Sequence, residues 1–161
     1  MVELGYRKNV GVVVFNGEGK VLLCARNDQV EDSWQFPQGG IEEGESIEAA
    51  AERELYEETG IKLIKSVAQM PNSLRYDFPA DFKLPFKGQE QDWVLFYFTG
   101  SNEEINFKVN PQEIEFRNYR WDDIKVAPDL IVDFKKDVYR KVVDFFYPII
   151  IDYLQGKTNG L

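Results

Sequence analysis

Three glutamates in the middle of the chain, Glu54, Glu57 and Glu58, have the spacing of a single chemical site. An α-helix turns by about 100° per residue, so side chains three and four positions apart lie on the same face. Carboxylates held this close repel one another unless cations neutralise them. A hard divalent ion with oxygen ligands is the natural neutraliser, and Mg²⁺ is usually bound together with substrate phosphates. The spacing therefore indicates a metal site that acts on a phosphate compound.

A short helix that follows a glycine-rich turn must position these glutamates. Ser46 is its expected N-cap and Gly60 is the glycine expected to end it. On this helix the three glutamates border the apolar stripe that faces the sheet or a cleft, whereas Glu48 and Glu52 fall nearly opposite and face water. A helix that was acidic only for solubility would place its charged residues on the face opposite the apolar stripe.

The segments around this helix alternate as in a mixed α/β domain. Runs rich in β-branched and aromatic residues predict strands at 9–15, 20–25, 34–36, 61–69, 74–78, 93–99 and 115–121, and helical spacing predicts a second helix over 132–154. The first two strands flank a short turn and predict a hairpin. The run WVLFYFT at 93–99 is the strongest strand signal and is expected at the centre of the sheet. No repeat, linker or composition shift divides the chain, so we expect one domain over residues 1–161.

The composition suits a packed globular domain in a reducing compartment. Of the 161 residues, 43% are hydrophobic and 14% aromatic, which is enough for a core without disulfides. No run approaches the roughly 20 apolar residues of a membrane span, and the opening residues do not read as a secretory signal. Cys24 is the single cysteine and cannot form an internal disulfide, which favours the cytoplasm.

Two features of the composition exclude whole classes of function. The chain has no histidine, which excludes histidine-based triads and histidine–zinc sites. Its net charge of −9 should repel long nucleic acids, so we expect no duplex DNA partner and no membrane partner. A nucleotide or an RNA end could still be held through a metal and a few cations. We expect a monomer or a weak dimer.

The segment from Gly39 to Ile61 reads GGIEEGESIEAAAERELYEETGI and resembles the Nudix box at every defined position. The match consists of Gly39, five residues, Glu45, seven residues and then RELYEETGI. This pattern is long and specific, so the chain is identified as a member of the Nudix hydrolase family. The resemblance implies an α/β/α sandwich with a mixed central sheet and the box as a loop–helix–loop. It also implies hydrolysis of a nucleoside diphosphate that is linked to another group.

Segments outside the box resemble bacterial RNA pyrophosphohydrolases and the wider (di)nucleoside polyphosphate hydrolase subgroup. These segments are 5–11, 33–40, 74–76, 88–93, 115–121 and 134–140. Similar bacterial enzymes remove pyrophosphate from the triphosphorylated 5′ end of RNA, a step in mRNA decay, and the alternative substrate is a dinucleoside polyphosphate such as diadenosine tetraphosphate. Where similar RNA enzymes carry two consecutive arginines, this chain has Arg26-Asn27, which weakens the RNA assignment relative to the dinucleotide one. A non-catalytic nucleotide sensor and a redox-responsive scaffold are weaker alternatives.

The resemblance implies the metal ligands and their supports. The three box glutamates are the expected catalytic carboxylates and ligands of Mg²⁺, with Mn²⁺ or another divalent cation as a substitute. Glu115 is expected to add a ligand, with Glu113 as the alternative, and the backbone carbonyl of Gln38 or Gly39 completes the shell. One ligand carboxylate or Glu115 takes the proton from water. Arg53 is expected to pair with Glu45 or with a catalytic glutamate and to position it.

The resemblance also implies the residues that hold the substrate. The expected substrate contacts are Arg7, Ser33, Gly39, Gly40, Arg75, Tyr76, Phe134 and Lys135. Cations of this set would hold phosphates, and an aromatic face would stack on a base. For Tyr76 and Phe134 the alternative is packing in the core.

Overall fold

A computed structural model describes residues 5–28 and 33–159 of the chain. The strands are β1 (Tyr6–Phe15), β2 (Val21–Arg26), β3 (Trp34–Gln35), β4 (Gln38–Gly40), β5 (Ile64–Gln69), β6 (Leu74–Asp77), β7 (Gly88–Phe98) and β8 (Phe116–Asp122). The α-helices are α1 (Ile47–Thr59), α2 (Ala127–Leu130) and α3 (Lys136–Asn159), and short 3₁₀ turns lie at Asn102–Glu104, Ile124–Val126 and Asp133–Lys135.

One mixed sheet joins all eight of these strands. Its main order is β3-β2-β1-β7-β5, with β4 paired to β1, β6 to β7 and β8 to β2. The pair β1/β7 is parallel, from Tyr6 opposite Gly88 to Phe15 opposite Tyr97, and the other pairs are antiparallel. Strand β7 lies inside the sheet against three neighbours, which confirms its predicted central place.

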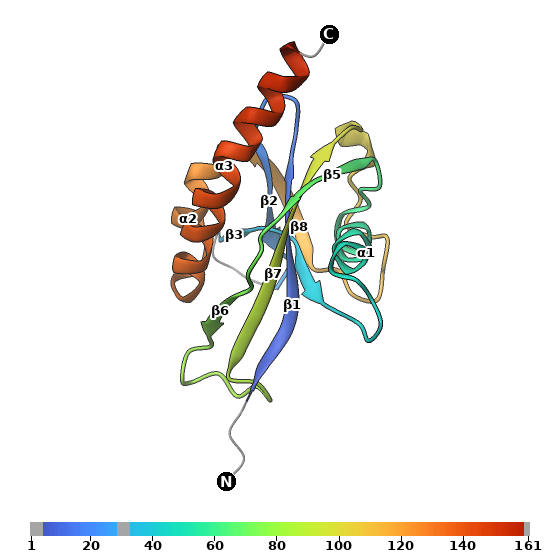
Figure 1. Cartoon of the computed structure of the whole chain (residues 1–161). Coiled ribbons are helices and arrows are strands. Elements are labelled where there is room, and N and C mark those ends of the chain that lie inside the picture. Colours follow the sequence, from blue (N-terminus) through green and yellow to red (C-terminus); the bar gives the residue numbers. More distant parts are fainter. Residues whose placement is uncertain (1–4, 29–32, 160–161) are drawn as a thin grey trace.

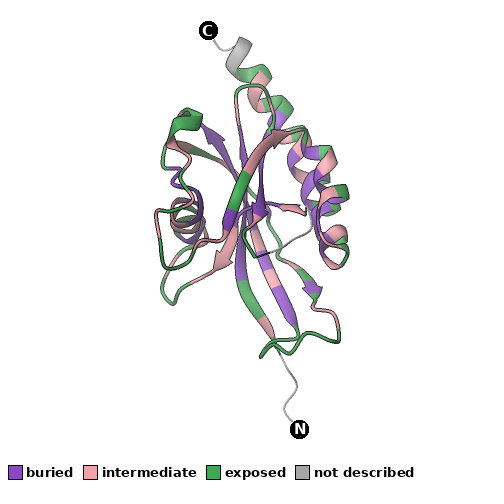
Figure 2. Cartoon of the chain, turned by 180° about the vertical axis from the view of Figure 1, so that it is seen from behind, coloured by how far each residue is buried: buried purple, intermediate pink, exposed green. Residues whose placement is uncertain are grey.

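Helices cover both faces of the sheet, as the resemblance implied. Helix α1 lies on one face, and α2 and α3 lie on the other (Figure 1). The side chains of β1 alternate between the two layers: Val13 and Phe15 pack in the cluster that includes α3, whereas Val12 and Val14 pack in the cluster that includes α1. Figure 2 shows the resulting buried stripe through the sheet. Burial on both faces explains why this strand reads as a continuous apolar run.

Both predicted ends of helix α1 are confirmed. The Oγ of Ser46 accepts a hydrogen bond of 3.1 Å from the amide of Ala49. Gly60 has a φ of 78°, a left-handed conformation that costs a glycine little, and its N–H donates to the carbonyl of Tyr56. These caps fix the start and end of the helix and therefore the direction in which its glutamates point.

The structure differs from the sequence prediction at several elements, and strand β7, for example, begins at Gly88 instead of at residue 93. The glycine-rich segment expected as a turn forms strand β4, in which Gly39 is paired with Val10 of β1. Glycine is a poor strand former, so propensity gave no signal for a strand there. Helix α2 was not predicted, and the helix expected from residue 132 begins as a 3₁₀ turn before α3. Within the residues that the structure describes, none of the helices has the length and apolar character that a membrane crossing requires.

Candidate active site

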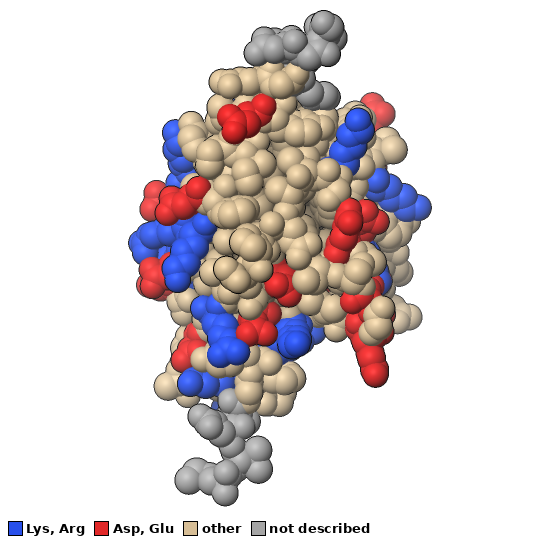
Figure 3. All heavy atoms as spheres, in the orientation of Figure 1, with Lys and Arg blue, Asp and Glu red and all other residues tan. Residues whose placement is uncertain are grey.

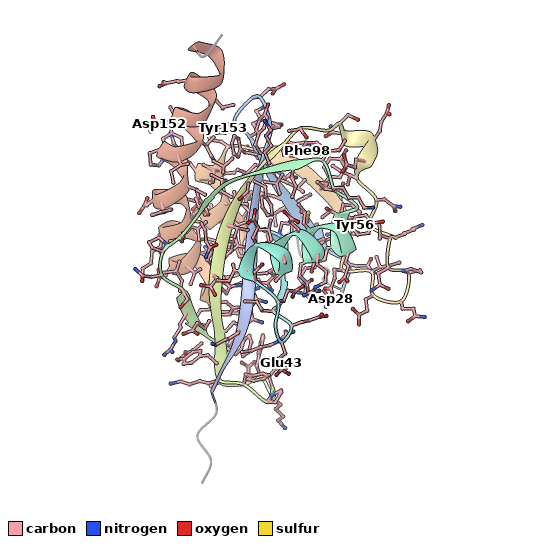
Figure 4. The ribbon with its side chains drawn as sticks, turned by 45° about the vertical axis from the view of Figure 1, so that its right-hand side comes forward. Asp28, Glu43, Tyr56, Phe98, Asp152 and Tyr153 are labelled. Carbon is pink, nitrogen blue, oxygen red and sulfur yellow. The ribbon has the colours of Figure 1, made fainter. Side chains whose placement is uncertain are left out.

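Helix α1 carries the three glutamates across one face of the sheet. Figure 4 shows the loop of Glu43 leading into the helix and Tyr56 near the end of the helix. As predicted, Glu48 and Glu52 are exposed, whereas Glu58 is only 9% exposed. The helix thus directs Glu58 into the protein, whereas Glu48 and Glu52 point into the solvent.

Arg53 connects helix α1 to the loop before it through several ion pairs and hydrogen bonds. Its Nε lies 2.7 Å and its Nη2 2.9 Å from the two carboxylate oxygens of Glu45. Nη2 also donates to the carbonyl of Gly40, and Nη1 donates to Glu54 at 2.8 Å and to Glu57 at 3.4 Å. Arg53 and the amide of Glu42 hold the pKa of Glu45 down at about 2. Arg53 thus contacts both Glu45 and the catalytic-site candidates, the two partners that the sequence left open.

Gly39 lets the backbone of β4 approach the Glu54 carboxylate. A Cβ added at Gly39 would overlap the carboxyl group of Glu54. The pairing of β4 with β1 holds this backbone in place. Glycine is therefore required here by close approach and not by its φ angle. The result is a small cradle in which the Glu54 carboxylate is held between Gly39 and Arg53.

Glu58 is a buried carboxylate with few hydrogen-bond donors around it. One of its oxygens accepts a hydrogen bond of 3.3 Å from the amide of Gln38. Burial raises the pKa of Glu58 well above its ordinary value, and the neighbouring charges of Glu54 and Glu115 raise it further. Burial also raises the pKa of Glu54, although Arg53 opposes this shift. The ionised forms of Glu54 and Glu58 are therefore poorly stabilised by their surroundings, and a cation beside them would compensate.

These carboxylates share a cavity of about 330 Å³, which we call the acidic cavity. It is lined by Arg7, Asn9, Arg26, Gln35, Gln38, Gly39, Gly40, Glu54, Glu58, Gln89, Glu113 and Glu115. Glu115 precedes β8, and its carbonyl accepts a hydrogen bond from Asn27 at the end of β2, so sheet pairing brings it to the helix. Both Glu115 and its alternative Glu113 reach the cavity.

The acidic cavity fits a hard divalent cation by its donor set. Glu54, Glu58 and Glu115 offer only oxygen atoms, and the mutual repulsion that helps to raise the pKa of Glu58 is of the kind that such a cation compensates. Among the residues described, no three acidic side chains already meet as a completed metal site. Glu57 is 43% exposed and bonded to Arg53, and it does not line the cavity. Its role as a ligand stays a prediction.

A second cavity of about 550 Å³, the aromatic cavity, adjoins the first. It is lined by Arg7, Arg26, Asp28, Gln35, Gln38, Tyr76, Phe78, Phe82, Leu84, Pro85, Phe86, Gln89, Val132, Phe134 and Lys135. Tyr76 donates a hydrogen bond of 2.7 Å to Gln89, and its ring lies 5.6 Å from that of Phe134. The Nζ of Lys135 lies 5.5 Å from the centre of the Tyr76 ring. Tyr76 and Phe134 therefore pack together and also reach open space.

Five polar residues line both cavities and join them into one cleft: Arg7, Arg26, Gln35, Gln38 and Gln89. Arg26 is held by a bidentate pair with Asp28, with both nitrogen–oxygen distances at 2.9 Å. The buried amide of Gln91 donates to Asn9 at 2.9 Å and to Gln38 at 2.8 Å. This network fixes the side chain of Gln38 at the boundary between the acidic and aromatic cavities.

Two predicted substrate residues lie apart from this cleft. Ser33 lines a neighbouring hollow with Asp133 and Lys136, although that hollow shares Val132 with the aromatic cavity. Arg75 lies on the exposed side of β6, where its Nε is 2.8 Å from Glu90 and its guanidinium covers the ring of Tyr6. The remaining predicted contacts, Arg7, Gly39, Gly40, Tyr76, Phe134 and Lys135, lie along the cleft.

Sequence reasoning missed the polar floor of the cleft. Asn9, Gln89 and Gln91 are buried polar residues in the N-terminal halves of β1 and β7. Gln89 and Gln91 are two positions apart and therefore point to the same face of β7. In the run 89–92 an uncharged amide alternates with a carboxylate, and this alternation is the signal that could have identified Gln89 and Gln91, because buried amides need partners.

Comparison with protein-family models gives a match to the NUDIX domain over residues 5–142. The chain is 42% identical over 153 residues to an RNA pyrophosphohydrolase of Zymomonas mobilis, with 91% of this chain and 97% of that protein covered. It is 44% identical to an RNA pyrophosphohydrolase of Bartonella quintana, with 89% and 91% covered.

Solved structures show the same fold at lower sequence identity. The dihydroneopterin triphosphate pyrophosphohydrolase of E. coli matches with a TM-score of 0.66 at 20% identity, over 86% of this chain and 97% of that one. An Ap4A hydrolase of C. elegans, in a binary complex, matches with a TM-score of 0.60 at 18% identity and the same coverage. At such identities the likeness shows the fold alone.

Proposed function

The chain belongs to the Nudix hydrolase family, and from this premise we propose that it removes pyrophosphate from the triphosphorylated 5′ end of RNA. The observation that carries the proposal is the joined cleft, in which carboxylates lie at one end, aromatic rings at the other and cations between them. A nucleotide with a phosphate chain presents the complementary groups in the same order. The relatives that are over 40% identical, and named RNA pyrophosphohydrolase, support RNA as the substrate.

The acidic cavity would supply the chemistry through Mg²⁺. Glu54, Glu58 and Glu115 would hold the ion, together with the backbone carbonyl of Gln38 or Gly39. A Mg²⁺ ion held there would withdraw charge from the phosphate oxygens and would make water a better nucleophile. The protein's own part is positional: Arg53 and the cradle at Gly39 hold the Glu54 carboxylate in one orientation. Because the Glu54 carboxylate is already oriented, it does not have to change its position when it binds the ion or accepts a proton.

The cations and rings of the cleft would hold the substrate. Arg7 lines both cavities and is positioned to bind phosphates that span the boundary between them. Phe134 in the aromatic cavity offers a ring face to a base, and Lys135 adds a charge beside it. Figure 3 shows basic and acidic side chains interspersed on the face that it displays, without a broad basic surface. This pattern favours recognition of an RNA end over binding of a duplex.

Product analysis with two substrates tests the proposal. Triphosphorylated RNA and diadenosine tetraphosphate are each incubated with the protein and Mg²⁺, and kcat/KM is measured for both. We expect pyrophosphate release from RNA with the higher kcat/KM. A higher kcat/KM on diadenosine tetraphosphate would favour the dinucleotide alternative. No phosphate or pyrophosphate release from any substrate would favour a nucleotide sensor.

Lys135 should make substrate capture dependent on pH. Burial lowers the pKa of Lys135 to about 8, and the charge of Arg26 contributes. Below this pH the free protein carries a cation that attracts phosphate, and as the pH rises through about 8 the charge is lost. Because kcat/KM reports the free enzyme, it should fall on the alkaline side with an apparent pKa of about 8. The neighbouring Tyr76 has a raised pKa and does not titrate in this range.

Lys135→Arg is the variant that isolates this effect. A guanidinium stays charged at these pH values, so the alkaline fall in kcat/KM should disappear. Lys136→Arg is the matched control, because Lys136 is paired with Asp133 outside the cleft and should keep the wild-type profile. An unchanged alkaline limb in Lys135→Arg would show that another group titrates.

We further propose that residues 1–161 act as one catalytic domain in the cytoplasm, as a monomer or a weak dimer. Mg²⁺ is the proposed cofactor, and Mn²⁺ or another divalent cation should support part of the activity.

A further inference from the structure

The loop between β6 and β7 exposes apolar side chains on the rim of the aromatic cavity. Phe82, Leu84 and Phe86 are 46%, 44% and 38% exposed, and all three line the cavity. The other large hydrophobic residues that are this exposed in the described part of the chain, Leu63 and Ile151, do not line it. Three apolar groups gathered at one rim suggest a surface that is covered in the working state.

Neighbouring rings hold Phe82 in a defined position. Its ring stacks on that of Phe78, with centres 6.1 Å apart and planes at 20°. It also meets the ring of Phe134 edge to face, with centres 5.6 Å apart and planes at 77°. Since Phe82 is nearly half exposed, part of the ring stays open to a ligand. A ring that is held before binding loses little entropy when a second aromatic group stacks on it.

The charges around the rim indicate what kind of group covers it. Arg7, Arg26 and Lys135 line the same cavity, and Asp28, the one acidic residue among the described residues that line it, is paired with Arg26. The aromatic cavity is continuous with the acidic cavity through five shared residues. Its volume of about 550 Å³ lies within the range of pockets that hold small ligands. An occupant that is aromatic and anionic, and that extends from the phosphate site, matches these features.

We propose that Phe82, with Leu84 and Phe86, forms a second stacking wall for an unpaired nucleobase of the RNA strand, beyond the base that stacks on Phe134. The inference rests on the proposed function and defines its substrate as a single-stranded 5′ end. Stacking tolerates any base because every base has a flat face. Binding to this wall would therefore depend on the length of the RNA strand and not on its sequence. A dinucleoside polyphosphate, with one base at each end of its phosphate chain, has no further base for the wall.

The test compares triphosphorylated single-stranded RNA of two and six nucleotides. In the wild type, kcat/KM should be higher for the longer RNA. In Phe82→Ser the ratio of the two values should fall by about tenfold, the loss expected for one base–ring stack. Phe82→Trp, which keeps a ring, should retain the ratio. Leu63→Ser is the matched control, because Leu63 is exposed but does not line the cavity, and it should keep the wild-type ratio.

The possible failures are distinguishable. A wild-type length ratio in Phe82→Ser, with the melting temperature unchanged, would overturn the second wall and leave the proposed function intact. Absence of pyrophosphate release from every RNA by the wild type would overturn both. A fall in the ratio with Leu63→Ser as large as with Phe82→Ser would also overturn the wall, because the effect would not depend on the cavity.

Discussion

Replacing Glu58 by glutamine is expected to lower kcat by about 10²- to 10⁴-fold, the range typical of a group that handles charge or protons at the reacting centre. The amide keeps the size of the side chain but removes the negative charge that would hold the cation. Glu54→Gln should act in the same way, since Glu54 lines the same cavity. The measurement is single-turnover hydrolysis of triphosphorylated RNA at saturating Mg²⁺.

The stability of the Glu58 variant provides a second readout. Without metal ions, Glu58→Gln should melt at the wild-type temperature or above it, because the amide avoids the cost of burying a charge. Adding Mg²⁺ should raise the melting temperature of the wild type more than that of the variant, since only binding to the folded state stabilises it. Glu52→Gln, on the exposed side of the same helix, is the matched control. Near-normal turnover in Glu58→Gln would refute its assignment as a ligand.

Gly39→Ala is expected to lower kcat/KM by about 10²-fold, since a displacement of about 1 Å at a catalytic group has an effect of this size. The added Cβ would overlap the Glu54 carboxylate. That carboxylate is the end of a flexible side chain, so it can move away and the fold should survive. The displaced group would leave both its cradle and its hydrogen bond to Arg53.

Two other glycines serve as controls for Gly39. A Cβ at Gly88 would overlap the backbone carbonyl of Tyr76, so Gly88→Ala should lower the melting temperature. A Cβ at Gly156 meets open space, and Gly156→Ala should leave both activity and stability near the wild type. If Gly39→Ala behaves like Gly88→Ala, the position matters for folding. If it behaves like Gly156→Ala, the Glu54 carboxylate does not need its cradle.

The helix and its acidic face could be predicted because they depend on local spacing. Caps at Ser46 and Gly60 and the period of 3.6 residues fix which side chains point inward, and the structure confirms both the caps and the exposure of Glu48 and Glu52. The position of Glu57 could not be predicted from helical spacing alone. Glu57 shares the helix face with Glu54, yet it contacts Arg53, its side chain is 43% exposed and it does not line the acidic cavity.

The rest of the site depends on contacts between distant segments. Glu115 reaches helix α1 only because β8 pairs with β2, and Gln38 and Gly39 only because β4 pairs with β1. No local pattern encodes these registers. The aromatic cavity is lined by rings from β6, from the loop after it and from the turn before α3. At these positions the sequence does not distinguish a ring that packs in the core from a ring that lines a cleft.

The division of the cleft between segments has an evolutionary consequence. The carboxylates of the acidic cavity come from helix α1 and from 113–115, whereas most of the aromatic rim comes from 76–89 and 132–135. The apolar loop after β6 connects β6 to β7, and its residues Phe82, Leu84 and Phe86 line the aromatic cavity but not the acidic cavity. Changes in that loop can therefore accumulate without altering the hydrolytic residues. Such modularity lets descendants of one ancestral catalyst diverge in what they recognise while the reaction itself is inherited unchanged.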